Sequence, residues 1–191
     1  MKHYQSAESF SLATLKGEYS NDSVVFTAGA ERAVVLLRDG RISSVEHTFD
    51  GVTKEIHEPL KRLEIGERNF QRKVDHYVIK NTNGEALMRL GQTFHVGDGG
   101  TWSSLPHDFE NFPEPGFEEL FFYILRGGSQ RAIQVGKGLF HDGAAVDDAW
   151  LVSDREFSQI PMGYHPVGGE PDVVVSYVWC YLCVKPEWEK V

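Results

Sequence analysis

Two of the eight histidines stand among residues that could bind a metal ion or move a proton. His107 lies in the segment TWSSLPHDFE, with Asp108 and Glu110 close by and Glu119 opening the next apolar stretch. His165 lies in PMGYHPVGG, whose residue types are typical of a rigid turn between two strands. Imidazole and carboxylate groups bind zinc, manganese and iron, and they also act as general acids and bases. On neighbouring strands of a small barrel, inward-pointing side chains would bring these groups together.

The remaining candidate ligands are less well placed. Cys180 and Cys183 form a C-x-x-C inside DVVVSYVWCYLCV, a β-branched and aromatic run typical of a strand. A redox C-x-x-C begins a helix, and thiols three residues apart on a strand point to opposite faces, so we expect buried structural cysteines. Six histidines lack a suitable neighbouring ligand and are interpreted as surface or core residues: His3, His47, His57, His76, His95 and His141.

The composition indicates a folded, acidic domain. The 191 residues carry 19 Lys and Arg against 28 Asp and Glu, a formal charge of −9. No basic run is longer than a pair, so a nucleic-acid partner is not expected. No window approaches the roughly 20 apolar residues that span a bilayer, and no signal peptide is recognisable. We therefore expect a cytoplasmic protein without a membrane partner. Nothing resembles a nucleotide-binding loop, a nucleophile elbow or a repeat.

Hydrophobic residues alternate with a period of two along most of the chain, which predicts an all-β fold. Asp39-Gly40 and Asn83-Gly84 are typical of hairpin turns. A helix is expected only over residues 53–65, where Ile56, Leu60 and Leu63 have helical spacing but Pro59 interrupts. The predicted strands cover residues 24–27, 33–37, 41–47, 70–80, 86–96, 119–125, 130–135, 149–153, 156–160 and 172–184.

From residue 70 onward the chain resembles the 5-deoxy-glucuronate isomerase family of inositol breakdown. It is similar, more distantly, to the isomerases of 5-keto-4-deoxyuronate. The resemblance is carried, in the family's order, by RKVDHY (72–77), WSS (102–104), PHD (106–108), EELFFY (118–123), QR (130–131) and PMGYHPV (161–167). Those enzymes are bicupins, pairs of small β-barrels of which the C-terminal one carries the metal. The resemblance therefore implies a cupin jelly-roll barrel with a few extra N-terminal strands.

The resemblance also implies a divalent metal, zinc or manganese, bound by His107, Glu119 and His165. The family motif P-P-H-x-H-D is reduced here to P-H-D, so one histidine ligand is missing. Asp108, Glu110 or water would fill the vacant position. Iron would instead favour an oxygenase. A site that has lost its metal would leave Glu119 and His165 as a hydrogen-bonded pair in a degenerate cupin.

The implied reaction is an aldose–ketose interconversion of a deoxy-uronate or a related carbohydrate. Glu119 would be the proton-transferring base, the metal ligand or both. Arg131 is the first candidate to bind the substrate carboxylate and Arg72 the second, with a solvated residue or a salt bridge as the alternative for each. Three tyrosines are candidates for hydroxyl contacts, with packing as the alternative: Tyr123, Tyr164 and Tyr177. The alternative function is a non-catalytic cupin that binds a sugar acid or acts as an accessory or regulatory protein.

The family enzymes are considerably longer than this chain, and residues 1–65 are too few for a complete N-terminal barrel. We expect residues 1–65 to form a partial β region that packs on a barrel formed by residues 66–191. Cupins often dimerise through edge strands, which must be covered in some way, so a homodimer is expected.

Overall fold

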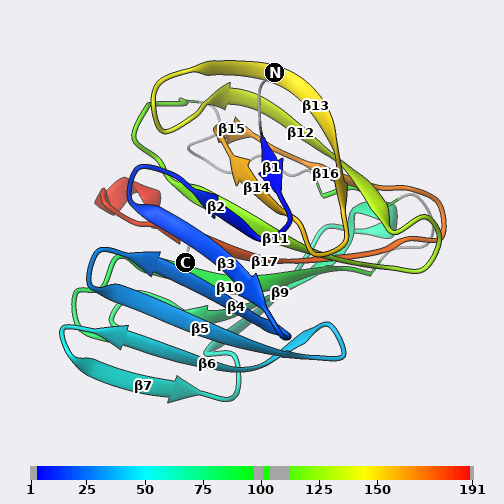
Figure 1. The fold of residues 1–191 in the computed structure, drawn as a ribbon. Coiled ribbons are helices and arrows are strands. Elements are labelled where there is room, and N and C mark those ends of the chain that lie inside the picture. Colours follow the sequence, from blue (N-terminus) through cyan, green and yellow to red (C-terminus); the bar gives the residue numbers. More distant parts are fainter. Residues whose placement is uncertain (1–3, 97–100, 104–111, 190–191) are drawn as a thin grey trace.

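The computed structural model describes residues 4–96, 101–103 and 112–189, which fold almost entirely as antiparallel β-strands (Figure 1). The strands form three sheets, of seven, six and four strands. Helical structure in the described residues is limited to the 3-10 turns Arg68–Phe70 and Pro186–Trp188. None of the described helical segments is long and apolar enough to cross a bilayer. The all-β prediction is therefore confirmed.

The seven-stranded sheet joins strands that lie far apart in the sequence, whereas the six-stranded sheet is made of consecutive strands. The seven-stranded sheet has the order β1 (Gln5–Ser6), β14 (Phe157–Ile160), β11 (Glu119–Arg126), β17 (Val174–Leu182), β10 (Met88–His95), β9 (Arg72–Val78) and β8 (Lys61–Ile65). The four-stranded sheet has the order β13 (Ala145–Ser153), β12 (Arg131–Leu139) and β15 (Met162–Tyr164), with β16 (Val167–Gly169) also paired to β12. The six-stranded sheet is a meander of β2 (Ser9–Ser11), β3 (Leu15–Ser20), β4 (Ser23–Ala28), β5 (Glu31–Arg38), β6 (Arg41–Phe49) and β7 (Val52–Ile56).

The seven-stranded sheet is the middle layer, because each of its faces packs on a different hydrophobic core. Toward the four-stranded sheet, β11 and β17 contribute Phe121, Tyr123, Tyr177 and Trp179. Toward the six-stranded sheet, the same two strands contribute the residues in between, which are Leu120, Phe122, Ile124, Val178, Cys180 and Leu182. A strand that is buried on both faces has an almost continuous run of apolar residues, as in ELFFYIL and VSYVWCYL.

The two cysteines follow the same alternation. Cys180 lies in the core toward the six-stranded sheet and Cys183 in the core toward the four-stranded sheet. Both are free thiols, and burial raises the pKa of each. The structure therefore agrees with the interpretation of C-x-x-C as two structural cysteines.

Two expectations from the sequence are corrected. No strand pairing joins the four-stranded to the seven-stranded sheet in the described part of the chain, so the two form an open sandwich there and not a closed barrel. The helix expected over residues 53–65 is also wrong, since β7 and β8 occupy this region. Asp50 and Gly51 adopt positive φ angles of 49° and 73° and close a hairpin that pairs β7 with β6. Pro59 lies between the two strands, where no ladder hydrogen bond is needed.

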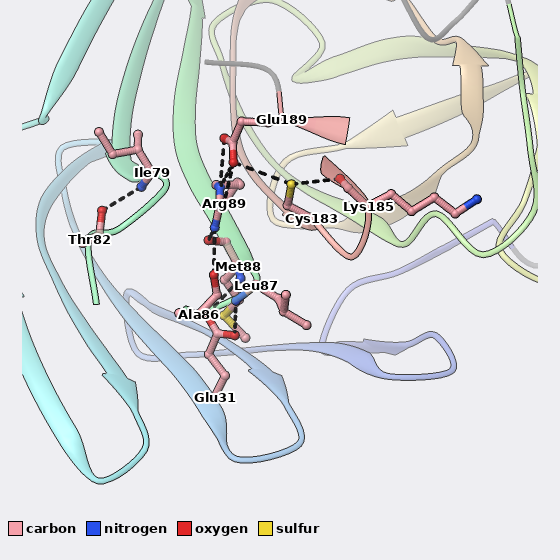
Figure 2. A network of polar contacts seen from close by, with 10 residues as sticks. All are labelled: Glu31, Ile79, Thr82, Ala86, Leu87, Met88, Arg89, Cys183, Lys185 and Glu189. Carbon is pink, nitrogen blue, oxygen red and sulfur yellow. Dashed lines mark hydrogen bonds and ion pairs between the residues drawn. The ribbon is translucent and has the colours of Figure 1, made fainter. Parts of the chain in front are cut away.

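A buried carboxylate connects the six-stranded sheet to the start of β10 (Figure 2). Glu31 accepts hydrogen bonds from the backbone N–H groups of Leu87 and Met88, both at 2.9 Å. Its Oε1 also lies 2.8 Å from Nε2 of His47, which is fully buried. These contacts satisfy a carboxylate that would be costly to bury alone.

The chain after β17 is held by an ion pair between the buried Arg89 and the half-buried Glu189 (Figure 2). Arg89 donates from Nε and Nη2 to the Glu189 carboxylate at 2.9 and 2.7 Å. The same guanidinium donates to the carbonyls of Ala86 and Met88. The Sγ of Cys183 lies 3.6 Å from a carboxylate oxygen of Glu189. The donors of Arg89 are therefore well supplied with acceptors.

The substitution Glu31→Gln should lower the free energy of unfolding by about 2–3 kcal/mol, because the amide has an NH₂ group where the carboxylate accepts two backbone N–H bonds. Urea unfolding measures the change. Glu46→Gln, at an exposed position of the neighbouring β6, is the matched control and should cost less than about 0.5 kcal/mol. Equal losses in the two variants would show that Glu31 does not connect the sheets.

Candidate functional site

The face of the seven-stranded sheet that meets the four-stranded sheet carries polar side chains among its aromatic ones; we call this buried region the interior face. Strand parity places these side chains there. On β9, Arg72 and His76 alternate with Lys73 and Asp75 and share a face with Val74, a member of that core. Other buried polar residues of this face, two of them from the segment that covers it, include Thr93, His95, Glu119, Thr101 and Ser103.

A line of aromatic rings crosses the interior face. The ring of His165 meets Phe121 edge-on at 6.0 Å between centroids, Phe121 stacks on Tyr177 at 4.4 Å, and Tyr177 meets His95 edge-on at 5.9 Å. These residues come from the end of β15, from β11, from β17 and from β10. The line of rings connects His165 to the part of the face that carries His95.

Glu119 is only 1% exposed and begins β11, two residues before Phe121 on the same face. Its charge contributes to raised pKa values of Tyr123 and Tyr177, for which burial is the larger cause. The carboxylate is therefore within electrostatic reach of both hydroxyls. Its neighbour Glu118 turns the other way and accepts the backbone N–H groups of Thr14 and Leu15 at 2.8 and 2.7 Å. Of the two adjacent glutamates, Glu119 alone shares a face with Phe121.

His165 is held in one orientation and one tautomer. Its Nδ1 lies 2.7 Å from the Gly163 carbonyl oxygen, so Nδ1 carries the proton and Nε2 the lone pair. Gln134 donates to the His165 carbonyl at 2.9 Å and accepts from the Tyr123 hydroxyl at 2.6 Å. Metal-binding histidines usually donate their second ring N–H to a carbonyl or carboxylate in this way. The imidazole therefore suits the ligand role that the sequence assigned to it.

Glycine is required where the His165 turn meets β12. Gly163 has a φ of 136°, and an added Cβ would lie 2.2 Å from the Lys137 carbonyl oxygen. The close approach of the two backbones sets the position of the Gly163 carbonyl, and with it the imidazole of His165.

The structure brings together only some of the residues that the sequence proposed. Glu119 lies two residues before Phe121 on the interior face, and the ring of His165 meets that of Phe121. His107 and Asp108 lie outside the described residues. Tyr164 is half-buried at the end of β15. Within the described residues, no three His, Cys, Asp or Glu side chains are grouped closely enough to hold a metal ion.

Arg131 does not lie in the interior. Its side chain is 50% exposed and its Nη2 is 3.3 Å from a Glu170 carboxylate oxygen. On β12 the inward residues are Ala132 and Gln134, so parity turns Arg131 outward. The prediction that Arg131 binds a substrate carboxylate is corrected accordingly, and its alternative, a surface salt bridge, is the one that the structure shows.

Arg72, the second candidate, lies on the interior face. It is 7% exposed, and its guanidinium donates to the Phe70 carbonyl at 3.3 Å. The sequence pattern could have indicated that Arg72 points inward, since Arg72, Val74 and His76 alternate with the charged Lys73 and Asp75.

His95 lies beside Arg72, opposite it in the β9–β10 ladder. From the sequence, His95 was interpreted as an ordinary surface or core residue. Its Nδ1 lies 3.0 Å from the Thr101 hydroxyl, and its buried Nε2 has no hydrogen-bond partner in the described structure. Burial, and to a lesser degree the charge of Arg72, lower its pKa to about 3. His95 is therefore neutral at physiological pH, with one ring nitrogen available.

A cavity of about 380 Å³ lies on the opposite face of the seven-stranded sheet. Phe122 and Ile124, which line it, belong to the core toward the six-stranded sheet. The charged groups at its mouth include Arg155, which pairs with Asp22 and Asp154. None of the described residues that the sequence proposed as catalytic or metal-binding lines this cavity.

The pKa of His95 predicts an acid-dependent loss of stability. The unfolded chain takes up a proton near the ordinary histidine pKa of 6.5, whereas folded His95 does so only near pH 3, so stability falls with pH between these values. From pH 7 to pH 5 the loss should be about 2 kcal/mol. His95→Gln should remove this component from urea unfolding at the two pH values. His57→Gln, at an exposed position, should retain it, and equal pH dependence in wild type and His95→Gln would contradict the assignment.

Known proteins resemble this chain in sequence and in fold. The 5-deoxy-glucuronate isomerase of Bacillus subtilis (strain 168) is 37% identical over 84 residues, which are 42% of this chain and 30% of that enzyme. The enzyme of the same name from Geobacillus kaustophilus is 26% identical over 110 residues, 56% of this chain and 38% of that enzyme. The matched segments therefore span less than half the length of these relatives.

The crystal structure of an IolB-like protein from Salmonella typhimurium LT2 superimposes with a TM-score of 0.56 and 18% identity. The match covers 87% of this chain and 64% of the Salmonella chain, and it shows a shared fold. The sequence model of the KduI/IolB family matches residues 19–190. Because this match covers most of the chain, including the strands of the interior face from β8 onward, the chain belongs to the KduI/IolB family.

Proposed function

We propose that this protein is a sugar isomerase that interconverts the aldose and ketose forms of a deoxy-uronate or a related sugar acid. The observation that carries the proposal is that Glu119 and His165 are both buried on the interior face, where Glu119 lies two residues before Phe121 on β11 and the ring of His165 meets that of Phe121. A carboxylate and an imidazole of fixed tautomer are the groups that a proton transfer between adjacent carbons needs. The isomerases named above, to which the chain is similar, support the same reaction class.

Family membership and the orientation of His165 also support a bound divalent cation, zinc or manganese. Glu119 and His165 would supply two ligands, and His107 and Asp108 are the candidates for the others. Bound there, the cation would polarise the sugar carbonyl and the adjacent hydroxyl and lower the free energy of an enediolate.

The described residues have defined parts in this reaction. Glu119 takes the proton from one carbon and returns it to its neighbour, while the Gly163 carbonyl and Gln134 keep His165 in position. Tyr177, fully buried between Phe121 and His95, offers a hydroxyl near the reacting carbons. The aromatic walls exclude water, which strengthens the electrostatic interactions inside. A cytoplasmic location and a homodimer stay predictions from the sequence.

The substitutions Glu119→Gln and His165→Gln should each lower the isomerisation rate of 5-deoxy-glucuronate at least about 100-fold, because each removes a group that contacts the reacting atoms. Conversion can be followed by proton NMR of the sugar. Glu46→Gln and His57→Gln, at exposed positions, are the matched controls and should retain wild-type rates. Turnover by the wild type that persists in the Glu119 and His165 variants would refute the proposed site.

Metal content tests the cation separately. Protein purified without chelator should contain close to one zinc or manganese ion per chain by plasma mass spectrometry, and His165→Gln should lose most of it. Metal content that is undiminished in both the Glu119 and His165 variants would place the ion elsewhere. A metal-free wild type that takes up no added metal and binds sugar acids without turnover would instead identify the alternative, a non-catalytic binding protein.

A further inference from the structure

Two arginines of this chain are equally buried but differently satisfied. Arg89, 5% exposed, has the Glu189 carboxylate at 2.7 Å (Figure 2). Arg72, 7% exposed, has a single hydrogen bond, to the Phe70 carbonyl at 3.3 Å, and no carboxylate partner among the described residues. A guanidinium presents five donors, and burying its charge is costly unless an anion accompanies it. Glu189 supplies that anion for Arg89, whereas none of the described carboxylates does so for Arg72.

A second unsatisfied group lies next to Arg72. His95 is its direct partner in the β9–β10 ladder, and the two side chains share the interior face. The Thr101 hydroxyl is hydrogen-bonded to Nδ1 of His95. The other ring nitrogen, Nε2, is buried and has no hydrogen-bond partner in the described structure. Because the pKa of His95 is lowered to about 3, Arg72 carries the positive charge of this pair. A cation and a neutral imidazole nitrogen, side by side and unsatisfied, match an anionic oxygen ligand.

This pair lies at the other end of the line of rings from His165. Tyr177 is the ring between them, since it meets His95 edge-on and stacks on Phe121. The charge of Arg72 lowers the pKa of Tyr177 while that of Glu119 raises it, although burial dominates. Arg72 and Glu119 therefore both act on the same hydroxyl, one as a cation and the other as an anion. A sugar acid with its reacting carbons at Glu119 would direct its carboxylate toward the cation.

We propose that Arg72 and His95 bind the carboxylate of the sugar-acid substrate. The proposal rests on the proposed function, and it adds the residues that select an acid over a neutral sugar and fix its direction in the interior. Arg72 pairs with the carboxylate through its planar fork, and His95 Nε2 hydrogen-bonds the carboxylate or the adjacent hydroxyl according to its tautomer.

The test compares D-glucuronate with D-glucuronamide, which replaces the charged carboxylate by a neutral amide of similar shape. Calorimetry on the wild type should show glucuronate bound at least about tenfold more tightly. Arg72→Gln should weaken glucuronate binding about 10- to 100-fold and bring the two affinities together. Arg131→Gln, which alters an exposed arginine, is the matched control and should keep the preference. A wild type without preference, or an Arg72→Gln protein that keeps it, overturns the proposal.

Thermal unfolding distinguishes a binding role for Arg72 from a structural one. Arg89→Met leaves the Glu189 carboxylate without its partner and should lower the unfolding midpoint. Arg72→Met removes a charge that has no carboxylate partner in the described part of the chain, so the midpoint should stay unchanged or rise. A fall as large as that of Arg89→Met would show that Arg72 supports the fold and would overturn the proposal.

Carboxylate binding by Arg72 and His95 and isomerase activity can be tested independently. Glu119→Gln should lack turnover and still prefer glucuronate to glucuronamide, because the carboxylate end of the site is intact. A wild type that prefers glucuronate but never isomerises a sugar would support the Arg72–His95 pair while refuting the catalytic proposal. A wild type that isomerises a sugar, together with an Arg72→Gln protein that still prefers glucuronate to glucuronamide, would support the catalytic proposal and refute the Arg72–His95 pair.

Discussion

The burial of β11 and β17 on both faces is the constraint on which the other features depend. Each strand must supply one set of side chains to the core toward the six-stranded sheet and the alternate set to the core toward the four-stranded sheet. A shift of one residue would exchange the two sets, so the register is fixed by packing. The same alternation separates Glu118, which accepts two backbone N–H groups of the six-stranded sheet, from Glu119, which lies on the interior face.

Most polar groups in such a buried layer have hydrogen-bond partners, so a group without a full set of partners is informative. Among the described residues, Arg72 and His95 lack a full set of partners and lie side by side, although Arg89 shows that this chain can supply a carboxylate to a buried guanidinium. Leaving such groups unsatisfied lowers stability, and proteins commonly accept that cost where they bind a ligand. The proposed site therefore combines a carboxylate and a candidate metal-binding imidazole near Phe121 with the Arg72–His95 pair, proposed to bind an acid, beyond Tyr177.

Period-two patterning predicted the all-β fold because alternation is a local property of the chain. The sequence could not show which strands share a sheet, and the helix expected over residues 53–65 failed because the Asp50-Gly51 turn and Pro59 set two short strands. Side-chain direction was the harder problem for the site. The sequence analysis placed Arg131 ahead of Arg72 as the residue that binds a carboxylate, whereas strand parity turns Arg131 outward to Glu170 and Arg72 inward.

A crystal structure of the protein soaked with D-glucuronate would test the central claim most directly. The sugar acid should lie between the seven-stranded and four-stranded sheets, with its carboxylate against Arg72 and His95 and its other end toward Glu119 and His165. Glucuronate bound instead in the cavity beside Phe122 and Ile124, on the opposite face of the seven-stranded sheet, with none on the interior face, would contradict it.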